Sequence, residues 1–306
     1  MFCRICNHQN EQFDSYHIND KMFDGKEIFE YFECSNCGTL QISKIPENIG
    51  SFYPDNYYSL SSKLSLKDKI LFRLRDYVFF YNFPSFFVKK LKIKMANLSL
   101  EAFLKLKPKE STKILDVGCG EGKFLKSIYN LGFKNITGIE PFALQEQEKP
   151  FPIYKKALEN INGKFGIITF NHVFEHLEDV NKTLKQCYDL LEKNGRIIIR
   201  VPVKDSYAFE HYKENWIQWG APRHFQLLTR KAFYILTKEN NFELIDYYHD
   251  SYKIQFAGSE KYKRNLSYQT PNSIFTKLEL EEFIKKSTEL NKQQKGDQIV
   301  AVLQKV

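Results

Sequence analysis

The 306-residue sequence lacks the features that would place the chain in a membrane or in an extended structural protein. It has no run of 18 apolar residues, which a membrane-spanning helix needs. Its first residues, Met1–Cys6, contain no basic start followed by an apolar stretch, so we expect no signal peptide. Fourteen glycines and ten prolines are too few for a collagen-like or linker-dominated chain. These absences predict a soluble, cytoplasmic protein.

The aromatic and charged residues indicate a folded protein with an anionic partner. An aromatic content of 15% excludes wholesale disorder, and 42% hydrophobic residues are enough to bury a sizeable core. Lysine and arginine together number 45 against 37 aspartates and glutamates, which gives a net charge of +8. This surplus favours a sugar nucleotide, a nucleic acid or an acidic membrane surface, without choosing among them.

Cysteine is scarce after residue 37, because four of the six cysteines form two C-x-x-C pairs before that point. In a chain without a secretion signal, such pairs are typical of metal ligands rather than disulfides. Gly38 directly follows the second pair and supplies the open backbone that such a turn requires. Four thiolates make a closed tetrahedral site, so we predict a structural zinc ion, with redox dithiols or unmetallated cysteines as alternatives. The predicted ligands are Cys3, Cys6, Cys34 and Cys37.

The chain divides into three predicted parts. Residues 1–45 are short, polar and cysteine-punctuated, and form the zinc ribbon. Residues 46–109 contain a turn-rich aromatic stretch and a helical pattern, and form a connector or lid. Over residues 110–306, strands alternate with helices, which predicts a parallel sheet covered on both faces. Loss of zinc is expected to unfold the first part alone, because metal binding supplies the folding free energy there.

A glycine-rich loop follows the first predicted strand, Lys113–Val117. Its glycines let the backbone pass close to a ligand, and parallel sheets bind ligands at the carboxyl ends of their strands. Asp116 precedes the loop, and an anionic residue there suits a cationic ligand better than a pyrophosphate. Glu140 ends the second strand and can accept hydrogen bonds from both hydroxyls of an adenosine ribose. Together these residues predict S-adenosylmethionine as the cofactor; a tight turn without a ligand is the alternative.

Four segments resemble, in order, the motifs of class I S-adenosylmethionine-dependent methyltransferases: Lys113–Phe124, Gly138–Pro141, Asn171–Leu177 and Leu191–Pro202. The resemblance covers roughly residues 110–250. It implies an α/β, Rossmann-like core that carries the small N-terminal zinc ribbon. It also implies which residues hold the methionine, ribose and adenine parts of the cofactor or lie near its sulfur. These are Asp116, Gly118, Cys119, Gly120, Glu140, Pro141, Ala157, Leu158, Asn171 and His172.

Methyl transfer to oxygen needs a base that removes the hydroxyl proton, and histidine suits that role near neutral pH. The candidates are His224, His176 and His172. The segment from His172 to His176 also matches the H-x-x-E-H of inverted zinc proteases. Its position directly after a strand favours a cofactor-loop segment instead. A positioning or packing role is the alternative for His172 and His176.

An aromatic-rich loop over residues 216–229 surrounds His224. Tryptophans stack on sugar rings, and arginine can hold a phosphate through two parallel hydrogen bonds. Acceptor-binding residues are therefore predicted in this loop and in the tyrosine-rich stretch before it: Trp216, Trp219, Arg223, Tyr57 and Tyr58. Buried tryptophans in a helix-entry loop, and ordinary interdomain packing of the tyrosines, are the alternatives.

The zinc module, the tyrosine-rich stretch and Pro222–Phe225 together resemble deoxysugar C-methyltransferases, which place a histidine base in a similar position. The Arg-His-Phe of this chain departs from the His-Glu-His-Phe of that family. We therefore predict an oxygen acceptor on a phosphate-bearing saccharide, either a nucleotide sugar or a surface-glycan unit.

Three alternatives to this function stay open. They are sugar C-methylation, RNA methylation with the zinc ribbon binding RNA, and a non-catalytic binding protein on a methyltransferase-like core. Asn171–Phe174 lacks the Asn/Asp-Pro-Pro-aromatic motif of base methylation, and the basic residues are scattered, which argues against nucleic acid. At most a peripheral membrane contact is expected, over residues 79–94. The sequence leaves the oligomeric state open.

Overall fold

A computed structural model describes residues 1–53 and 98–306 of the chain, which divides into two compact units. Unit 1 comprises Met1–Tyr53, His172–Tyr188 and Ile199–Val306, and unit 2 comprises Pro54–Asn171 and Asp189–Ile198. Tyr57, Tyr58 and most of the predicted connector lie outside the described residues. The part boundaries at residues 45 and 109 stay predictions.

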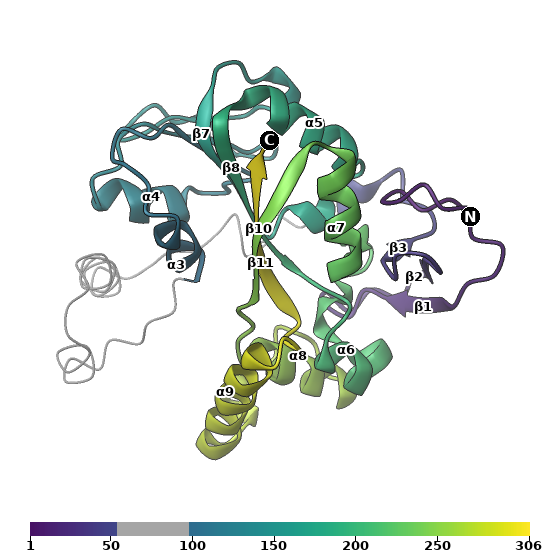
Figure 1. The fold of residues 1–306 in the computed structure, drawn as a ribbon. Coiled ribbons are helices and arrows are strands. Elements are labelled where there is room, and N and C mark those ends of the chain that lie inside the picture. The colour runs from purple at the N-terminus through teal and green to yellow at the C-terminus, as the bar shows by residue number, and fades with distance from the viewer. Residues whose placement is uncertain (54–97) are drawn as a thin grey trace. The chain divides into compact units, whose positions relative to one another are not determined.

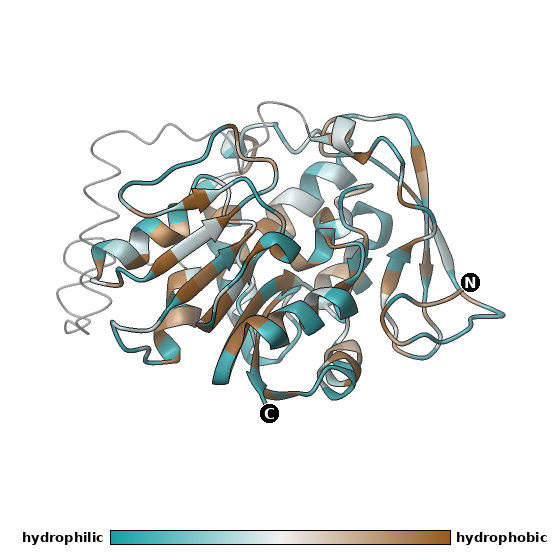
Figure 2. Ribbon diagram, turned by 90° about the horizontal axis from the view of Figure 1, so that it is seen from above, coloured by the Kyte–Doolittle hydropathy of each residue, from teal (hydrophilic) through white to brown (hydrophobic). Residues whose placement is uncertain are grey.

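Unit 2 is built on parallel strands rich in isoleucine, valine and phenylalanine. β4 (Ile114–Val117) lies between β5 (Ile136–Ile139) and β7 (Phe165–Asn171), and β6 (Ile153–Tyr154) lies beyond β5. Figure 2 shows these strands as largely hydrophobic, as expected where both faces of a sheet are covered. The carboxyl ends of the strands lie at one edge of the sheet, where ligands of this architecture bind.

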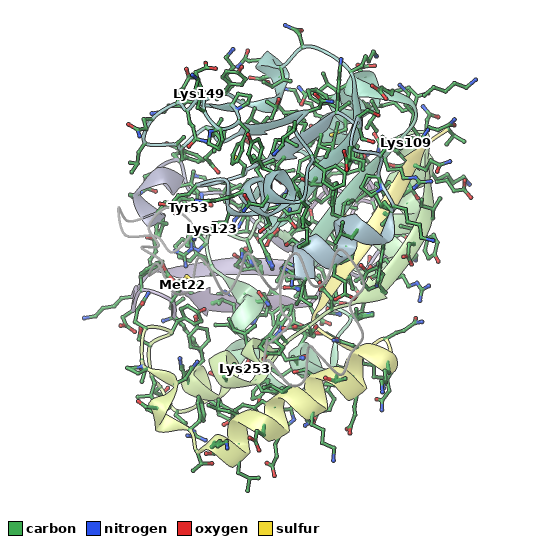
Figure 3. The ribbon with its side chains drawn as sticks, turned by 90° about the vertical axis from the view of Figure 1, so that its left-hand side faces the viewer. Met22, Tyr53, Lys109, Lys123, Lys149 and Lys253 are labelled. Atoms are coloured by element: carbon green, nitrogen blue, oxygen red, sulfur yellow. The ribbon has the colours of Figure 1, made fainter. Side chains whose placement is uncertain are left out.

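Two helices of unit 2 pack through phenylalanine side chains. α3 (Leu98–Lys105) buries Phe103, whose ring lies edge-on to Phe124 of α4 (Lys123–Asn130) at a centroid distance of 5.8 Å. The same ring meets Phe133 at 5.0 Å. Lys109 and Lys149 lie outside this core and are exposed (Figure 3). The unit also contains the 3-10 turn η2 (Leu158–Asn160).

Strand β8 (Leu191–Pro202) belongs to both units: its residues up to Ile198 belong to unit 2, and those from Ile199 belong to unit 1. Within unit 2 the strand order is β8-β7-β4-β5-β6. Within unit 1 the same strand borders β11 (Gln298–Lys305), which pairs antiparallel with β10 (Phe242–His249). The sheet is therefore mixed rather than wholly parallel. The predicted α/β, Rossmann-like architecture is confirmed.

Three helices of unit 1, α6, α7 and α9, begin at side-chain caps. Thr229 accepts a hydrogen bond from the backbone N–H of Ala232, and Thr276 forms a reciprocal capping box with Glu279. In Figure 1, α7 lies along β10, and α8 lies beside α9.

None of the helices in residues 1–53 and 98–306 has the length and apolar character that crossing a membrane requires. The helices and turns are η1 (Ile49–Phe52), η3 (Phe174–His176), α5 (Val180–Leu190), α6 (Tyr207–Tyr212), η4 (Lys213–Asn215), η5 (Ile217–Trp219), α7 (Arg230–Glu239), α8 (Ile254–Lys263), η6 (Asn272–Ile274) and α9 (Lys277–Lys292).

The N-terminal strands form a second, antiparallel sheet. Its order is β1 (Ser15–Asn19), β2 (Ile28–Glu33), β3 (Leu40–Ile42) and β9 (Gln226–Leu227). β9 comes from the loop that carries His224, far along the chain. The cysteine-bearing segment and this loop therefore share one sheet, which the sequence did not predict.

Candidate functional site

The glycine loop of unit 2 turns sharply between β4 and α4. Gly118 and Gly120 have φ angles of +67° and +52°, a conformation that favours glycine. The N–H of Gly118 donates to the carbonyl of Ile139 (2.8 Å), and the N–H of Gly120 donates to Oε2 of Glu140 (3.1 Å). The loop thus brings the predicted ribose-binding carboxylate next to the glycine backbone.

Asp116 is a buried carboxylate at the carboxyl end of β4. Thr169 Oγ1 donates to its Oδ1 (2.6 Å), and Asn171 Nδ2 lies 3.4 Å from the same oxygen. Burial raises the pKa of Asp116 to about 7, against the opposing effect of these two donors. A cationic ligand would favour the charged carboxylate, so the site fits the sulfonium-bearing cofactor. Thr169 was not predicted, although it lies on the same strand face as Asn171, two residues away.

The remaining predicted cofactor residues also lie in unit 2, apart from His172. Cys119 is half-buried, its Sγ lies 3.6 Å from the carbonyl of Gly120, and burial raises the pKa of its thiol. Pro141 follows Glu140, and Ala157 directly precedes η2, which begins at Leu158. Their roles toward the ribose, adenine and sulfur stay predictions.

The four predicted metal ligands converge in unit 1. One sulfur from each of Cys3, Cys6, Cys34 and Cys37 lies within 4.8 Å of the others. The Cys3–Cys37 and Cys6–Cys34 Sγ distances are 3.6 and 3.7 Å, and all four cysteines are free of disulfides. A tetrahedron of sulfurs around zinc has edges of about 3.8 Å, because each Zn–S bond is about 2.3 Å. The donor set therefore fits a structural zinc ion.

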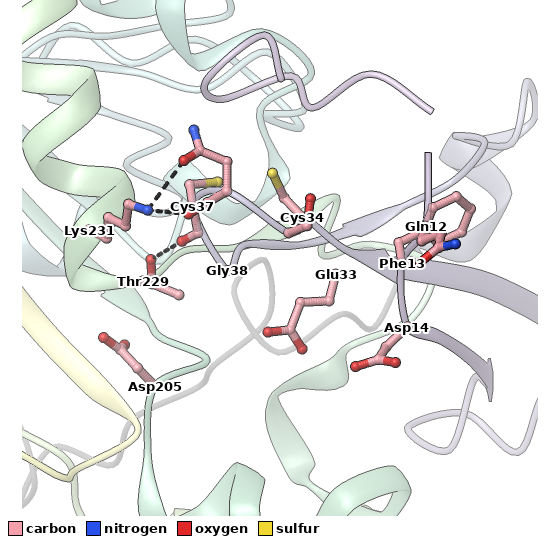
Figure 4. A pocket seen from close by; sticks show the side chains of 12 residues that line it. Gln12, Phe13, Asp14, Glu33, Cys34, Cys37, Gly38, Asp205, Thr229 and Lys231 are labelled. Carbon is pink, nitrogen blue, oxygen red and sulfur yellow. Dashed lines mark hydrogen bonds between the residues drawn. The ribbon is translucent and has the colours of Figure 1, made fainter. Parts of the chain in front are cut away.

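The two C-x-x-C turns have the same backbone form. Asn7 and Gly38, which follow the second cysteine of each pair, both have positive φ angles, of 54° and 72°. Beside the second turn, a cavity of about 640 Å³ is lined by Glu33, Asp205 and Lys231, among others (Figure 4). Thr229 Oγ1 donates to the carbonyl of Cys37 (2.5 Å), which ties this turn to the start of α7.

The three candidate histidines gather around one buried carboxylate in unit 1. Glu175 is only 1% exposed. Among the residues that the structure describes, no donor lies in hydrogen-bonding geometry to either of its carboxylate oxygens. Nδ1 of His172 lies 3.4 Å from Oε1 of Glu175. The rings of His176 and His224 lie edge to face, with centroids 4.9 Å apart. The sequence predicted the histidines but not Glu175, although the H-x-x-E-H segment contains it.

Hydrogen bonds define the protonation pattern of these rings. His176 Nδ1 lies 2.8 Å from the carbonyl of Arg223, and His224 Nδ1 lies 2.7 Å from the carbonyl of Gln218. Because a carbonyl can only accept, both Nδ1 atoms carry the proton, and both Nε2 atoms keep a lone pair. Tyr53 Oη lies 3.3 Å from the same nitrogen of His176.

His172 has the same tautomer, but here the hydrogen bond to Nε2 defines it. Arg200 Nη1 lies 2.9 Å from its Nε2, and arginine can only donate, so Nδ1 carries the proton and faces Glu175. Arg200 is itself held by Asp250, at 2.5 Å. The backbone of His172 has a φ angle of +56°, which is uncommon outside glycine and is often retained at functional sites. Arg200 and Asp250 were not predicted, since nothing local in the sequence links them to His172.

Burial keeps the imidazoles of His176 and His224 uncharged. Burial, together with the neighbouring His176, lowers the pKa of His224 to about 3, and burial also lowers that of His176. Burial alone would raise the pKa of Glu175, but His172 and the other two histidines outweigh it and lower this pKa to about 2. The cluster therefore holds the carboxylate of Glu175 beside the neutral imidazoles of His176 and His224 at neutral pH. Such a group can accept a proton, and Glu175, His176 and His224, with ligand atoms within 4.8 Å of one another, could hold a divalent cation.

The predicted acceptor residues of the aromatic loop lie in the core of unit 1. Trp216 Nε1 donates to Asp297 (3.1 Å), and Trp219 Nε1 donates to the carbonyl of Lys213 (2.8 Å). Arg223 is 1% exposed and donates to both carboxylate oxygens of Asp20. The structure thus supplies a packing or pairing partner for each of the three, and their contact with an acceptor stays a prediction.

Comparison with known proteins agrees with this fold and cofactor. A family model described as a methyltransferase domain matches residues 88–247. The mitochondrial ubiquinone biosynthesis O-methyltransferase of Saccharomyces cerevisiae is 27% identical over 52% of this chain and 53% of its own length. The ubiquinone biosynthesis O-methyltransferase of Pelagibacter ubique is 26% identical over 45% of this chain and 64% of its own length. The chain thus spans roughly half to two-thirds of these curated relatives. A methyltransferase structure from Archaeoglobus fulgidus shares 18% identity over 73% of this chain and all of its own, with a TM-score of 0.45.

The comparison overturns one expectation. A saccharide acceptor, whether a nucleotide sugar or a surface-glycan unit, was wrong, because the curated relatives are named for ubiquinone biosynthesis and O-methylation. The saccharide expectation used tryptophan and arginine as residue types that bind sugars and phosphates, and the same types also occur in protein cores. In the structure, Trp216, Trp219 and Arg223 are buried, and Arg223 pairs with Asp20.

Proposed function

The chain belongs to the methyltransferase-domain family and is an S-adenosylmethionine-dependent methyltransferase, and from this premise we propose that it methylates a hydroxyl group of a quinone-type acceptor. The names of the curated relatives support both the oxygen acceptor and the quinone-type ring. The buried carboxylate among three histidines is the structural observation that carries the proposal. The cytoplasmic location expected from the sequence stays a prediction.

The chemistry of such an acceptor matches the histidine cluster. A ring hydroxyl resembles that of tyrosine, with a pKa near 10, so it needs a base to become a good nucleophile at neutral pH. A neutral imidazole with a free Nε2 lone pair can take this proton, and Glu175 can stabilise the resulting imidazolium. His224 is the proposed base, with His176 and His172 as the alternatives. The hydroxyl oxygen forms the new bond to the methyl carbon as the bond from that carbon to sulfur breaks.

The cofactor role falls to the glycine loop. S-adenosylmethionine would supply the activated methyl group. Glu140 is proposed to hold the ribose hydroxyls, and Asp116 the positively charged part of the cofactor. The two C-x-x-C pairs are proposed to hold one structural zinc ion, which takes no part in methyl transfer because its four protein ligands close the site.

The test is label transfer from methyl-labelled S-adenosylmethionine into a catechol, with its dimethyl ether as the matched non-acceptor and total RNA in parallel. We expect label in the catechol as a methyl ether, and His224→Gln should lower turnover by about 10²- to 10⁴-fold without weakening cofactor binding. His211→Gln, an exposed histidine of the same unit, is the control. Label in RNA, with none in the catechol, would overturn the acceptor class.

A further inference from the structure

We propose that Arg4 is a positioning residue, through which the four-cysteine site fixes the loop that carries His224. This assignment rests on the proposed function only for the role of His224 as a base. The coupling itself is a property of unit 1 that can be measured without any acceptor. This coupling predicts that zinc loss also changes the His224 loop, whereas the sequence led us to expect an effect on the N-terminal module alone.

Arg4 lies between the two cysteines of the first C-x-x-C pair, and its side chain reaches out of the metal site. Its Nη2 donates to the carbonyl of Ile42 and to that of Phe225, both at 2.9 Å. Its backbone N–H donates to Oε1 of Gln41 (2.8 Å), whose Nε2 lies 2.9 Å from Cys3 Sγ. Arg4 thus contacts Gln41, which lies beside a metal-ligand sulfur, through its backbone, and contacts β3 and the His224 loop through its guanidinium.

The far end of this connection reaches the histidine cluster directly. Phe225 follows His224, and its backbone N–H donates to the carbonyl of Glu175 (2.8 Å). Tyr31, on strand β2 of the N-terminal sheet, donates its hydroxyl to the carbonyl of His224 (2.9 Å). The backbone on both sides of the His224 side chain is therefore held by residues of the N-terminal sheet or of the Glu175 turn.

Gln226, the residue after Phe225, also connects the N-terminal sheet with the Glu175 turn. Gln226 pairs with Gln41 across β3 and β9, and its Nε2 donates to the carbonyls of Phe174 (2.9 Å) and Leu177 (2.7 Å). These two carbonyls flank Glu175 and His176 in the chain. The side chain of Gln226 is fully buried, so these contacts have no water to replace them when they are lost.

Arginine suits this position because one guanidinium nitrogen carries two N–H bonds that can meet two carbonyls at once. Methionine at position 4 would keep the apolar stem and leave both carbonyls without this donor. A purely local packing role would lower the stability of the N-terminal module and leave the His224 loop unchanged. A positioning role would loosen the loop while zinc stays bound.

The experiment is hydrogen–deuterium exchange on the full chain, with zinc content and S-adenosylmethionine affinity measured on the same samples. Wild type, zinc-stripped wild type and Arg4→Met are compared, and Lys44→Met, an exposed residue of the same module, is the matched control. In Arg4→Met we expect full zinc content, cofactor affinity within about twofold, and amide exchange over residues 223–228 faster by roughly tenfold or more. Zinc-stripped wild type should show the same acceleration, and Lys44→Met should not.

Two outcomes would overturn the proposal: wild-type exchange over 223–228 in zinc-loaded Arg4→Met, or wild-type exchange there after zinc removal. If Arg4→Met fails to retain zinc, Arg4→Lys keeps a positive charge beside the thiolates and is judged by the same exchange criterion. Failure of the acceptor test would leave these exchange rates unaffected, so the two proposals can fail separately.

Discussion

Arg223 and Asp20 form a two-pronged ion pair, in which Nη1 and Nη2 of the arginine each lie 2.7 Å from a different carboxylate oxygen. The two residues are 203 positions apart in the chain, and both are buried. Arg223 also donates to the carbonyl of Phe52 (3.1 Å). The pair thus connects the turn after β1 with the segment just before His224.

Replacing Arg223 with methionine should destabilise the protein by about 3–5 kcal/mol, because Asp20 would remain as a buried charge without its partner. Urea denaturation at pH 7 measures this loss. The double variant Arg223→Met, Asp20→Asn should recover part of it, since it removes the stranded charge. A single variant as stable as wild type, with acceptor affinity reduced, would instead support the predicted contact between Arg223 and an acceptor.

Cofactor affinity should depend on pH through Asp116. Its carboxyl group, with a pKa raised to about 7 by burial, loses its proton as pH rises from 6 to 8, and the charged form attracts the cationic cofactor. Binding of S-adenosylmethionine should therefore tighten by roughly tenfold across this range. Calorimetric titration at several pH values measures the slope.

The amino group of the cofactor titrates near the same range, so the informative quantity is the difference between proteins. Asp116→Asn should bind more weakly and show a flatter pH dependence. Glu148→Gln, an exposed residue of the same unit, should follow wild type. Equal slopes for wild type and Asp116→Asn would show that Asp116 does not titrate with cofactor binding.

The parts of the fold that follow from local pattern could be predicted from the sequence. Short apolar strands, a glycine loop and the acid that ends the next strand specify unit 2, because each signal lies within a few residues. The pairing of β9 with β3 could not be predicted, since a two-residue strand has no periodicity and its partner lies far away in the chain. The burial of Arg223 depends in the same way on Asp20. Local signals therefore predict the glycine loop and its acid, whereas contacts between distant segments, such as β3 with β9, cannot be read from the sequence.

Zinc content should depend on each of the four clustered cysteines. Cys34→Ser removes one thiolate from the closed site and should weaken zinc binding by roughly a hundredfold or more, with a lower midpoint of thermal unfolding. A colorimetric zinc assay after dialysis measures the stoichiometry, which should be one ion in wild type. Cys119→Ser, which belongs to the glycine loop of unit 2, should keep its zinc. A wild type that binds no zinc, or a Cys34→Ser variant that keeps a full equivalent, would contradict the assignment.

Acid should destabilise unit 1 through His224. The folded pKa of this histidine is lowered from an ordinary 6.5 to about 3, so between these values the unfolded chain binds a proton that the folded chain does not. The stability is therefore fully present above pH 6.5 and is lost as pH falls toward 3. Asp116 has the opposite effect on stability. Because its pKa is raised from 3.8 to about 7, its contribution to the free energy of unfolding is fully present below pH 3.8 and is lost as pH rises toward 7.

His224→Gln separates these contributions, because glutamine cannot titrate. Between pH 7 and 4.5, wild type should lose more free energy of unfolding than this variant, by on the order of 2 kcal/mol. Urea denaturation at both pH values measures the difference, with His17→Gln, an exposed histidine of β1, as the control that should follow wild type. Equal losses in wild type and His224→Gln would mean that His224 accepts a proton in the folded protein as readily as in the unfolded chain. Its Nε2 would then be free to titrate near neutral pH, and His176, whose pKa is also lowered by burial, would become the better candidate for a base held in its neutral form.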